Sequence, residues 1–132
     1  MHEVIHSDEA PRAIGPYSQA IAVPARGPGG PGLIFLSGQI PLDPGTGELV
    51  RGTIEEETAR VMENLRAVLQ AGGAGFAAVV KTTIYLTDLA DFARVNQVYG
   101  GYFPADPPAR ATVQVAALPR GARVEIDAVA AI

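Results

Sequence analysis

The sequence predicts an α+β protein in which two amphipathic helices pack on one face of a single mixed β-sheet. Two observations support this class. Segments with strand and helix patterns follow the order two strands, helix, strand, helix, two strands, and each helical segment carries only one apolar stripe. Because a single stripe buries a single side of a helix, both helices are expected on the same face. The other face of the sheet is then left uncovered.

The N-terminal part of the chain predicts a short edge strand followed by a hairpin. Residues 2–6 form the edge strand, and residues 13–23 begin with a Gly-Pro turn and continue as an apolar strand. A loop rich in glycine and proline, Pro24–Gly32, leads to a buried strand at 33–40 that ends in the small polar pair Ser37-Gly38. The two strands are expected to pair through a loop longer than most hairpins use.

The first helix begins with a capping box, Thr53-Ile54-Glu55-Glu56, and ends at Gly72-Gly73. Its acidic residues Glu55, Glu56 and Glu57 fit a solvated first turn better than a catalytic or metal-binding patch. The apolar stripe is made of Ile54, Val61, Met62, Leu65, Val68 and Leu69.

The second half of the chain predicts a central strand at 79–86, rich in β-branched residues, and a helix capped by Asp88. A strand at 107–115, a turn at 118–121 and a last strand at 123–132 complete the sheet. The helical spacing of the second helix is carried by Phe92, Val95, Asn96, Tyr99 and Phe103.

The strand at 107–115 carries the first candidate site residue, Arg110. Side chains alternate along a strand, so Arg110, Thr112 and Gln114 are expected on one face and Val113 and Val115 on the other. A guanidinium group on such a polar face can bind a carboxylate through two parallel hydrogen bonds. From this segment alone, an ordinary solvated arginine is equally compatible.

Glu125 is the second candidate. A tight turn at 118–121 would place Gln114 beside Glu125 in antiparallel register, with Glu125 on the uncovered face together with Arg110. Four strand residues at about 3.3 Å each would separate the two backbones by roughly 13 Å. Val129 and Ala131 share this face and offer apolar area for subunit association. The face is therefore interpreted as a ligand site, a subunit interface, or both.

Composition narrows the function classes. The 132 residues are expected to form one domain, 1–132, with 48% hydrophobic and 18% charged residues. A net charge of −4 without a lysine or arginine cluster disfavours nucleic acid as a partner. There is no cysteine, no apolar run long enough for a membrane span and no secretory signal, so a soluble cytoplasmic protein is expected.

Several motifs, in this order and spacing, resemble the RidA family, also called YjgF/YER057c/UK114. The resemblance runs nearly end to end. It includes the Asp88-Leu89 pair after the central strand and Leu118-Pro119. The other matching segments are Ile14-Gly15-Pro16-Tyr17-Ser18-Gln19, Ser37-Gly38-Gln39-Ile40-Pro41, Lys81-Thr82-Thr83, Phe92-x-x-x-Asn96-x-x-Tyr99, Pro108-Ala109-Arg110-Ala111-x-Val113 and Val124-Glu125-Ile126.

The resemblance implies a chorismate-mutase-like fold, with a six-stranded mixed sheet and two helices on one side. It implies a homotrimer that associates through the bare sheet faces, with a ligand cleft at each subunit boundary. The implied activity is hydrolysis of 2-imino acids or their enamine tautomers, such as 2-iminobutanoate and 2-iminopropanoate, to 2-oxo acids and ammonia. Pyridoxal-phosphate-dependent dehydratases release these intermediates from threonine or serine, and no cofactor or metal is expected for their hydrolysis.

The resemblance also assigns roles to residues. Arg110 matches the arginine that binds the substrate carboxylate, and Glu125 matches the acid that positions or activates water. Positions matching substrate-binding residues are Tyr17, Ser37, Gly38, Asn96, Ala111 and Thr112. Two departures stand out. Thr112 occupies a position that is often cysteine in the family, which excludes thiol chemistry there. The Pro24–Gly32 loop is long and is expected to alter the rim of the cleft or an outer surface.

Two other function classes compete with the deaminase. A non-catalytic metabolite-binding or chaperone-like protein has the same fold, although the presence of both Arg110 and Glu125 argues against it. A ribonuclease or translation-inhibitor activity has also been attributed to the family. That activity is disfavoured because the only histidines, His2 and His6, lie near the terminus and no basic groove is apparent.

Overall fold

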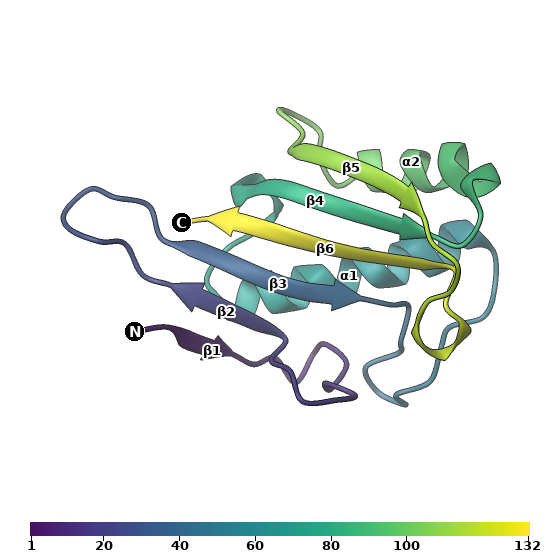
Figure 1. Cartoon of the computed structure of the whole chain (residues 1–132), viewed down its shortest axis with the longest axis horizontal. Helices are drawn as coiled ribbons and strands as arrows, with labels where there is room; N and C mark the ends of the chain where they lie inside the picture. Colours follow the sequence, from purple (N-terminus) through teal and green to yellow (C-terminus); the bar gives the residue numbers. More distant parts are fainter.

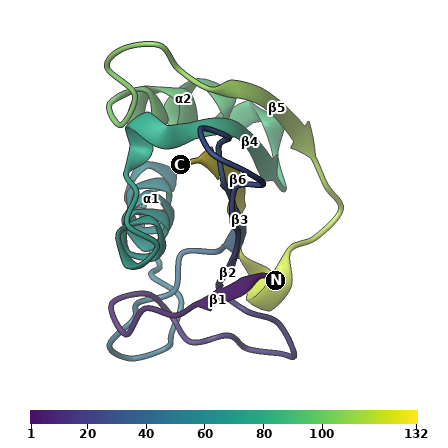
Figure 2. The ribbon, with the colours of Figure 1, turned by 90° about the vertical axis from the view of Figure 1, so that its left-hand side faces the viewer.

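A computed structural model describes all 132 residues and has the predicted architecture, a six-stranded mixed sheet with two helices on one face (Figures 1 and 2). The helices are α1 (Ile54–Ala71) and α2 (Phe92–Gly100), with short 3₁₀ turns at Phe76–Ala78, Leu89–Asp91 and Pro119–Gly121. The strands are β1 (Glu3–Ile5), β2 (Ala20–Val23), β3 (Leu33–Gln39), β4 (Val79–Leu86), β5 (Ala109–Gln114) and β6 (Val124–Ala131).

The strand order is β1-β2-β3-β6-β4-β5, and all neighbours are antiparallel except β4 and β5, which are parallel. The hairpin between β2 and β3 is confirmed. The expected antiparallel pairing of β5 with β6 is wrong, because β6 enters the sheet between β3 and β4. Burial explains the choice. Val124, Ile126, Ala128 and Ala130 of β6 are all at most 4% exposed, whereas the more polar β5 takes the edge.

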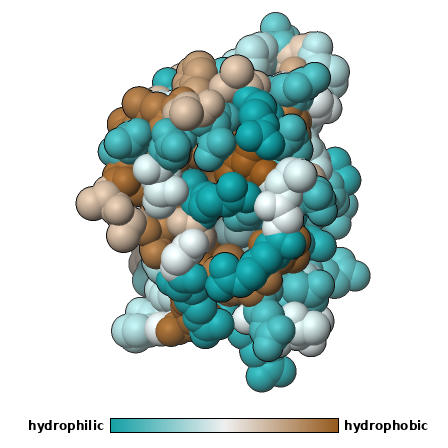
Figure 3. Space-filling view, turned by 90° about the vertical axis from the view of Figure 1, so that its right-hand side faces the viewer, coloured by the Kyte–Doolittle hydropathy of each residue, from teal (hydrophilic) through white to brown (hydrophobic).

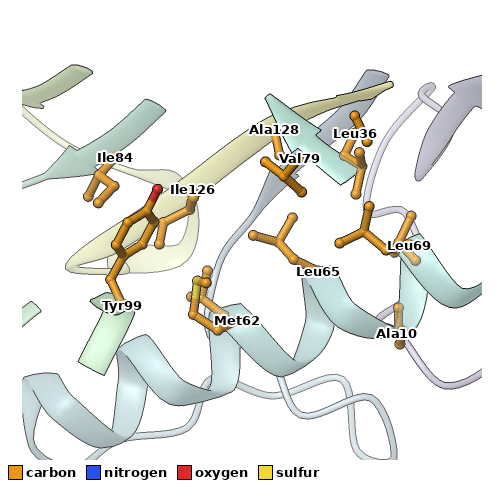
Figure 4. Close-up of a cluster of buried hydrophobic side chains, with 14 of the residues drawn as sticks. Ala10, Leu36, Met62, Leu65, Leu69, Val79, Ile84, Tyr99, Ile126 and Ala128 are labelled. Atoms are coloured by element: carbon orange, nitrogen blue, oxygen red, sulfur yellow. The ribbon is translucent and has the colours of Figure 1, made fainter. Parts of the chain in front are cut away.

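The core lies between α1 and the centre of the sheet (Figure 4). Every residue of the predicted α1 stripe is buried, and the predicted capping box is present, with the Glu56 amide donating to Oγ1 of Thr53 at 3.1 Å. The expectation of a solvated first turn is wrong for Glu57. Its carboxylate is buried and accepts hydrogen bonds from Arg123, the residue before β6, which ties α1 to the sheet.

The second helix begins later than its predicted cap. Asp88 caps the preceding 3₁₀ turn by accepting from the Ala90 amide at 2.9 Å, and α2 itself starts at Phe92. Val95 and Tyr99 are buried against the sheet, but Phe92 remains 39% exposed near the β5 edge. Neither helix is long and apolar enough to cross a membrane.

Asn64 in α1 fixes the chain that leaves β3. Its side-chain amide donates to the backbone oxygens of Ile40 and Leu42, at 3.3 and 2.9 Å, and its Oδ1 accepts from Nε of Arg60. We expect Asn64→Ala to lower the free energy of unfolding by about 2–4 kcal/mol, because buried carbonyl groups lose their donors. Denaturant titration measures this value. The control Gln70→Ala, at an exposed position of α1, should change stability by less than about 0.5 kcal/mol. Equal effects of the two variants would contradict the role of Asn64.

Candidate active site

A β-bulge near the end of β3 shapes the first half of the site. Leu36 pairs with Ala128 and Gln39 with Ile126. Between these two pairs β3 contains one more residue than β6. Leu36 and Gln39 are both buried, and the extra residue lies in the Ser37-Gly38 pair between them. The bulge therefore sets two small residues beside the first residues of β6, and Gly38 lies next to the Glu125 side chain.

Glu125 packs directly over Gly38. A Cβ atom added to Gly38 would lie 2.8 Å from Cδ of Glu125, so no larger residue fits while the carboxyl group keeps this position. The two residues share a cavity of about 290 Å³ with Ile14, Tyr17, Ser37, Ile40 and Pro119. Figure 3 views the end of the molecule where β3 and β4 finish and β6 begins, and shows hydrophobic patches among mostly hydrophilic residues. Glu125 is thus an acidic group in a partly apolar recess.

The hydroxyl groups in this cavity also hold its walls together. Oγ of Ser37 donates to the backbone oxygen of Ser18 at 2.6 Å, and the Tyr17 hydroxyl accepts from the Ile14 amide at 3.2 Å. The Tyr17 proton and the lone pairs of Ser37 remain for a ligand. The predicted residues Tyr17, Ser37, Gly38 and Glu125 are therefore brought together.

Burial raises the pKa of Glu125 above the ordinary value of a glutamate, and the nearby carboxylate of Asp127 adds to the effect. Asp127 points to the same face and accepts a hydrogen bond from the Tyr85 hydroxyl at 3.0 Å. At any given pH, Glu125 is therefore protonated more often than an exposed glutamate. A group of this kind can exchange protons with a bound ligand closer to neutrality.

The raised pKa also predicts a pH-dependent effect on stability. Because the folded state binds this proton more tightly than the unfolded state does, the ionised carboxylate opposes folding above the raised pKa. The penalty fades as the pH falls toward the unfolded value of about 4.3. We expect Glu125→Gln to be more stable than the wild type at pH 7, with a difference that shrinks toward pH 4. Denaturant titrations at equal protein concentration test this. The exposed Glu9→Gln is the control, and a destabilised Glu125→Gln at pH 7 would refute the prediction.

Arg110 lies in a second cavity, of about 380 Å³, between the start of β5 and α2. Its Nη1 donates to Oδ1 of Asn96 at 2.7 Å, and its Cζ lies 5.0 Å from the ring centroid of Tyr99 and 5.7 Å from that of Phe92. The side chain is exposed, is kept in place by these contacts, and has no carboxylate partner within the chain. Gly100, Phe103, Pro107 and Pro108 complete the cavity.

The expectation that Arg110 and Glu125 share a face is wrong within one chain. Arg110 is the register partner of the buried Thr82, and Glu125 is the partner of Tyr85. Thr82 and Tyr85 are three residues apart on β4, so they point to opposite faces. Arg110 consequently faces α2 at the sheet edge, while Glu125 lies on the uncovered face. The prediction required a hairpin between β5 and β6, whereas β6 pairs with β3 and β4.

The remaining predicted residues lie outside both cavities. Ala111 is exposed on the uncovered side of β5, and Thr112 points to the helix side with its hydroxyl buried and unpartnered. Gln114 accepts from the Leu89 amide at 2.9 Å, which links β5 to the 3₁₀ turn. The Pro24–Gly32 loop lies at the opposite end from Glu125 and rims neither cavity (Figure 1). The expectation that this loop alters the cleft is therefore not supported by the single chain.

Comparison with known proteins gives concordant matches over the whole chain. Residues 7–132 match the family model described as endoribonuclease L-PSP. The chain is 63% identical over 128 residues to protein DfrA of Myxococcus xanthus, covering 97% of this chain and 94% of that protein. It is 49% identical over 130 residues to the 2-iminobutanoate/2-iminopropanoate deaminase of Mus musculus, covering 98% and 91%.

Solved structures agree with the sequence matches. RidA from an Antarctic Psychrobacter species has a TM-score of 0.87 and 42% identity, covering 98% of this chain and 99% of that one. TdcF of E. coli, solved with bound serine, has a TM-score of 0.86 and 38% identity, covering 98% of each chain. The six-stranded mixed sheet and two helices described above are the fold of these proteins. The chain belongs to the RidA family, also known as the YjgF or endoribonuclease L-PSP family.

Proposed function

We propose that this protein hydrolyses small 2-imino acids and their enamine tautomers to 2-oxo acids and ammonia. The observation that supports this most directly is the presence of two half-sites with complementary chemistry, one in each cavity. Arg110 offers a guanidinium group for a carboxylate, and Glu125 offers a carboxyl group of raised pKa beside Tyr17 and Ser37. Relatives named 2-iminobutanoate/2-iminopropanoate deaminase supply the substrate class.

The chemistry requires only water and proton transfers. The oxygen of water adds to C2 of the imine as the C=N double bond opens, and one water proton passes by way of Glu125 to the nitrogen. The C–N bond of the tetrahedral adduct then breaks. The hydroxyl proton is transferred to the departing nitrogen, and the products are a 2-oxo acid and ammonia. Arg110 holds the carboxylate throughout, with a charge-assisted pair worth about 1.5–3 kcal/mol.

We further propose that each complete site forms between two subunits of a cyclic homotrimer. Within one chain, Arg110 and Glu125 lie on opposite faces of the sheet and in cavities that share no residue. A neighbouring copy that covers the open face could bring its Arg110 edge to the Glu125 cavity. Exposed apolar side chains on the open face, Phe35 and Val113, supply area for such an interface.

The test is a coupled assay of the wild-type protein. A threonine dehydratase generates 2-iminobutanoate, and semicarbazide traps the imine that escapes hydrolysis. We expect the protein to increase 2-oxobutanoate release and to decrease the trapped imine. Folded protein that binds 2-oxobutanoate in calorimetry without accelerating release would overturn the deaminase proposal and favour the metabolite-binding alternative.

A further inference from the structure

The guanidinium group of Arg110 rests on two aromatic rings of α2. Phe92, Asn96 and Tyr99 are spaced four and three residues apart, so they form one stripe on the helix facing the start of β5. The centroid distances of 5.0 Å to Tyr99 and 5.7 Å to Phe92 are both within the range of cation–π attraction, about 6 Å. Asn96 uses only one of the five N–H groups, which leaves about four for a ligand.

One of the two rings is anchored in the core. The hydroxyl groups of Tyr99 and Thr82 share a hydrogen bond of 2.6 Å, and both residues are at most 5% exposed. Thr82 is also the register partner of Arg110 across β4 and β5. Arg110 is thus linked to Tyr99 in two ways. Its backbone pairs with Thr82, whose hydroxyl group is hydrogen-bonded to Tyr99, and its guanidinium group lies over the Tyr99 ring. Figure 4 shows Tyr99 rising from α2 toward Ile84 and Ile126 of the sheet.

The other ring has no comparable role in the core. Phe92 is 39% exposed, although it lies at an end of α2 where a polar residue would be easier to solvate. Its centroid is nevertheless within cation–π range of the guanidinium group of Arg110. The exposed Phe92 ring therefore has the guanidinium group of Arg110 as a close neighbour.

We propose that Phe92 and Tyr99 are positioning residues that fix the guanidinium plane of Arg110 before the substrate carboxylate arrives. An unrestrained arginine side chain loses rotamer freedom when it binds a carboxylate, which weakens binding. An arginine that is already fixed by neighbouring side chains does not lose this freedom on binding. This inference rests on the proposed function only in taking the ligand of Arg110 to be the carboxylate of a small 2-imino or 2-oxo acid. The residues act through Arg110, so they should influence carboxylate binding more than the hydrolytic step.

The central test replaces Phe92 with leucine, which keeps apolar bulk but removes the ring face. We expect Phe92→Leu to bind 2-oxobutanoate about five- to tenfold more weakly in calorimetry and to raise KM by a similar factor, with kcat within twofold. Phe92→Tyr, which restores a ring, should bind within twofold of the wild type. The control Leu89→Ala removes apolar area at the same end of α2 and should not affect binding.

A spectroscopic measurement makes the test independent of turnover. The Nε–Hε signal of Arg110, assigned from its loss in Arg110→Lys, should be displaced by ring currents in the wild type and should return toward the free-arginine position in Phe92→Leu. An undisplaced wild-type signal, or unchanged binding and signal in Phe92→Leu, would overturn the inference. Wild-type protein with the displaced signal and ring-dependent 2-oxobutanoate binding, but without imine hydrolysis, would refute the deaminase and leave the positioning role intact.

Discussion

Replacing Arg110 with alanine is expected to lower kcat/KM for 2-iminobutanoate by about 10²- to 10³-fold while the protein stays folded. The variant loses the charge-assisted bond to the carboxylate and, with it, the alignment of the imine carbon with the attacking water. Arg110 is exposed and contributes little to the core, so circular dichroism and the thermal transition should change little. The dehydratase-coupled assay measures the loss.

The chain offers a close control in Arg66. This arginine also lies over two aromatic rings, at 5.6 Å from Phe76 and 5.2 Å from Tyr102, and its Nη1 donates to Glu63 at 3.1 Å. It lines neither of the two cavities. Arg66→Ala therefore removes an equivalent set of interactions and should retain wild-type turnover. Equal losses in the two variants, or a fully active Arg110→Ala, would contradict the carboxylate-binding role.

Mixing two inactive variants is expected to restore about one quarter of wild-type activity. Arg110→Ala and Glu125→Gln each destroy every site in a homogeneous assembly. In a random one-to-one mixture, a site is complete when one subunit supplies Arg110 and its neighbour supplies Glu125. This happens for about one site in four, because each condition is met half of the time in a closed ring. The assay is run after the two variants are unfolded and refolded together.

The recovery has a clear negative control. Variants refolded separately and then mixed without subunit exchange should stay inactive, and native mass spectrometry establishes whether mixed assemblies are present. Mixed assemblies with no activity would show that Arg110 and Glu125 do not act across a boundary, and the shared-site proposal would then fail. Near-wild-type activity of either pure variant would contradict the assigned roles more directly.

The sequence predicted the helices and strands better than it predicted which strands lie side by side in the sheet. The stripe of α1 and the β-branched run of β4 are local patterns, and both helices and all six strands lie close to the expected ranges. The position of β6 is not local. It depends on which strand has the most apolar side chains facing the helices. The alternation of apolar and polar residues alone does not show whether the strand that begins at Val124 pairs with β5 or with β4. The short connection after β5 suggested a hairpin that the structure does not form.

Of the predicted site residues, four line the Glu125 cavity and two line the Arg110 cavity, and the sequence did not predict this division. Ser37 and Gly38 were recognised as a small polar pair, but the bulge that sets them beside Glu125 breaks the two-residue period on which face assignments depend. The prediction that Arg110 lies on the open face also depends on the two-residue period, combined with an antiparallel pairing of β5 and β6 that the structure does not contain. The aromatic partners of Arg110, Phe92 and Tyr99, share the helical spacing predicted for α2, but only Tyr99 is buried.

The placement of the two half-sites also bears on how the protein behaves when it is scarce. If complete sites form between subunits as proposed, a lone protomer holds Arg110 and Glu125 in separate cavities and has no complete site. Dilution below the dissociation constant of the assembly would then silence turnover without denaturing anything, and reconcentration would restore it. Output would therefore rise more steeply than in proportion to abundance, making cellular supply itself a control on the reaction.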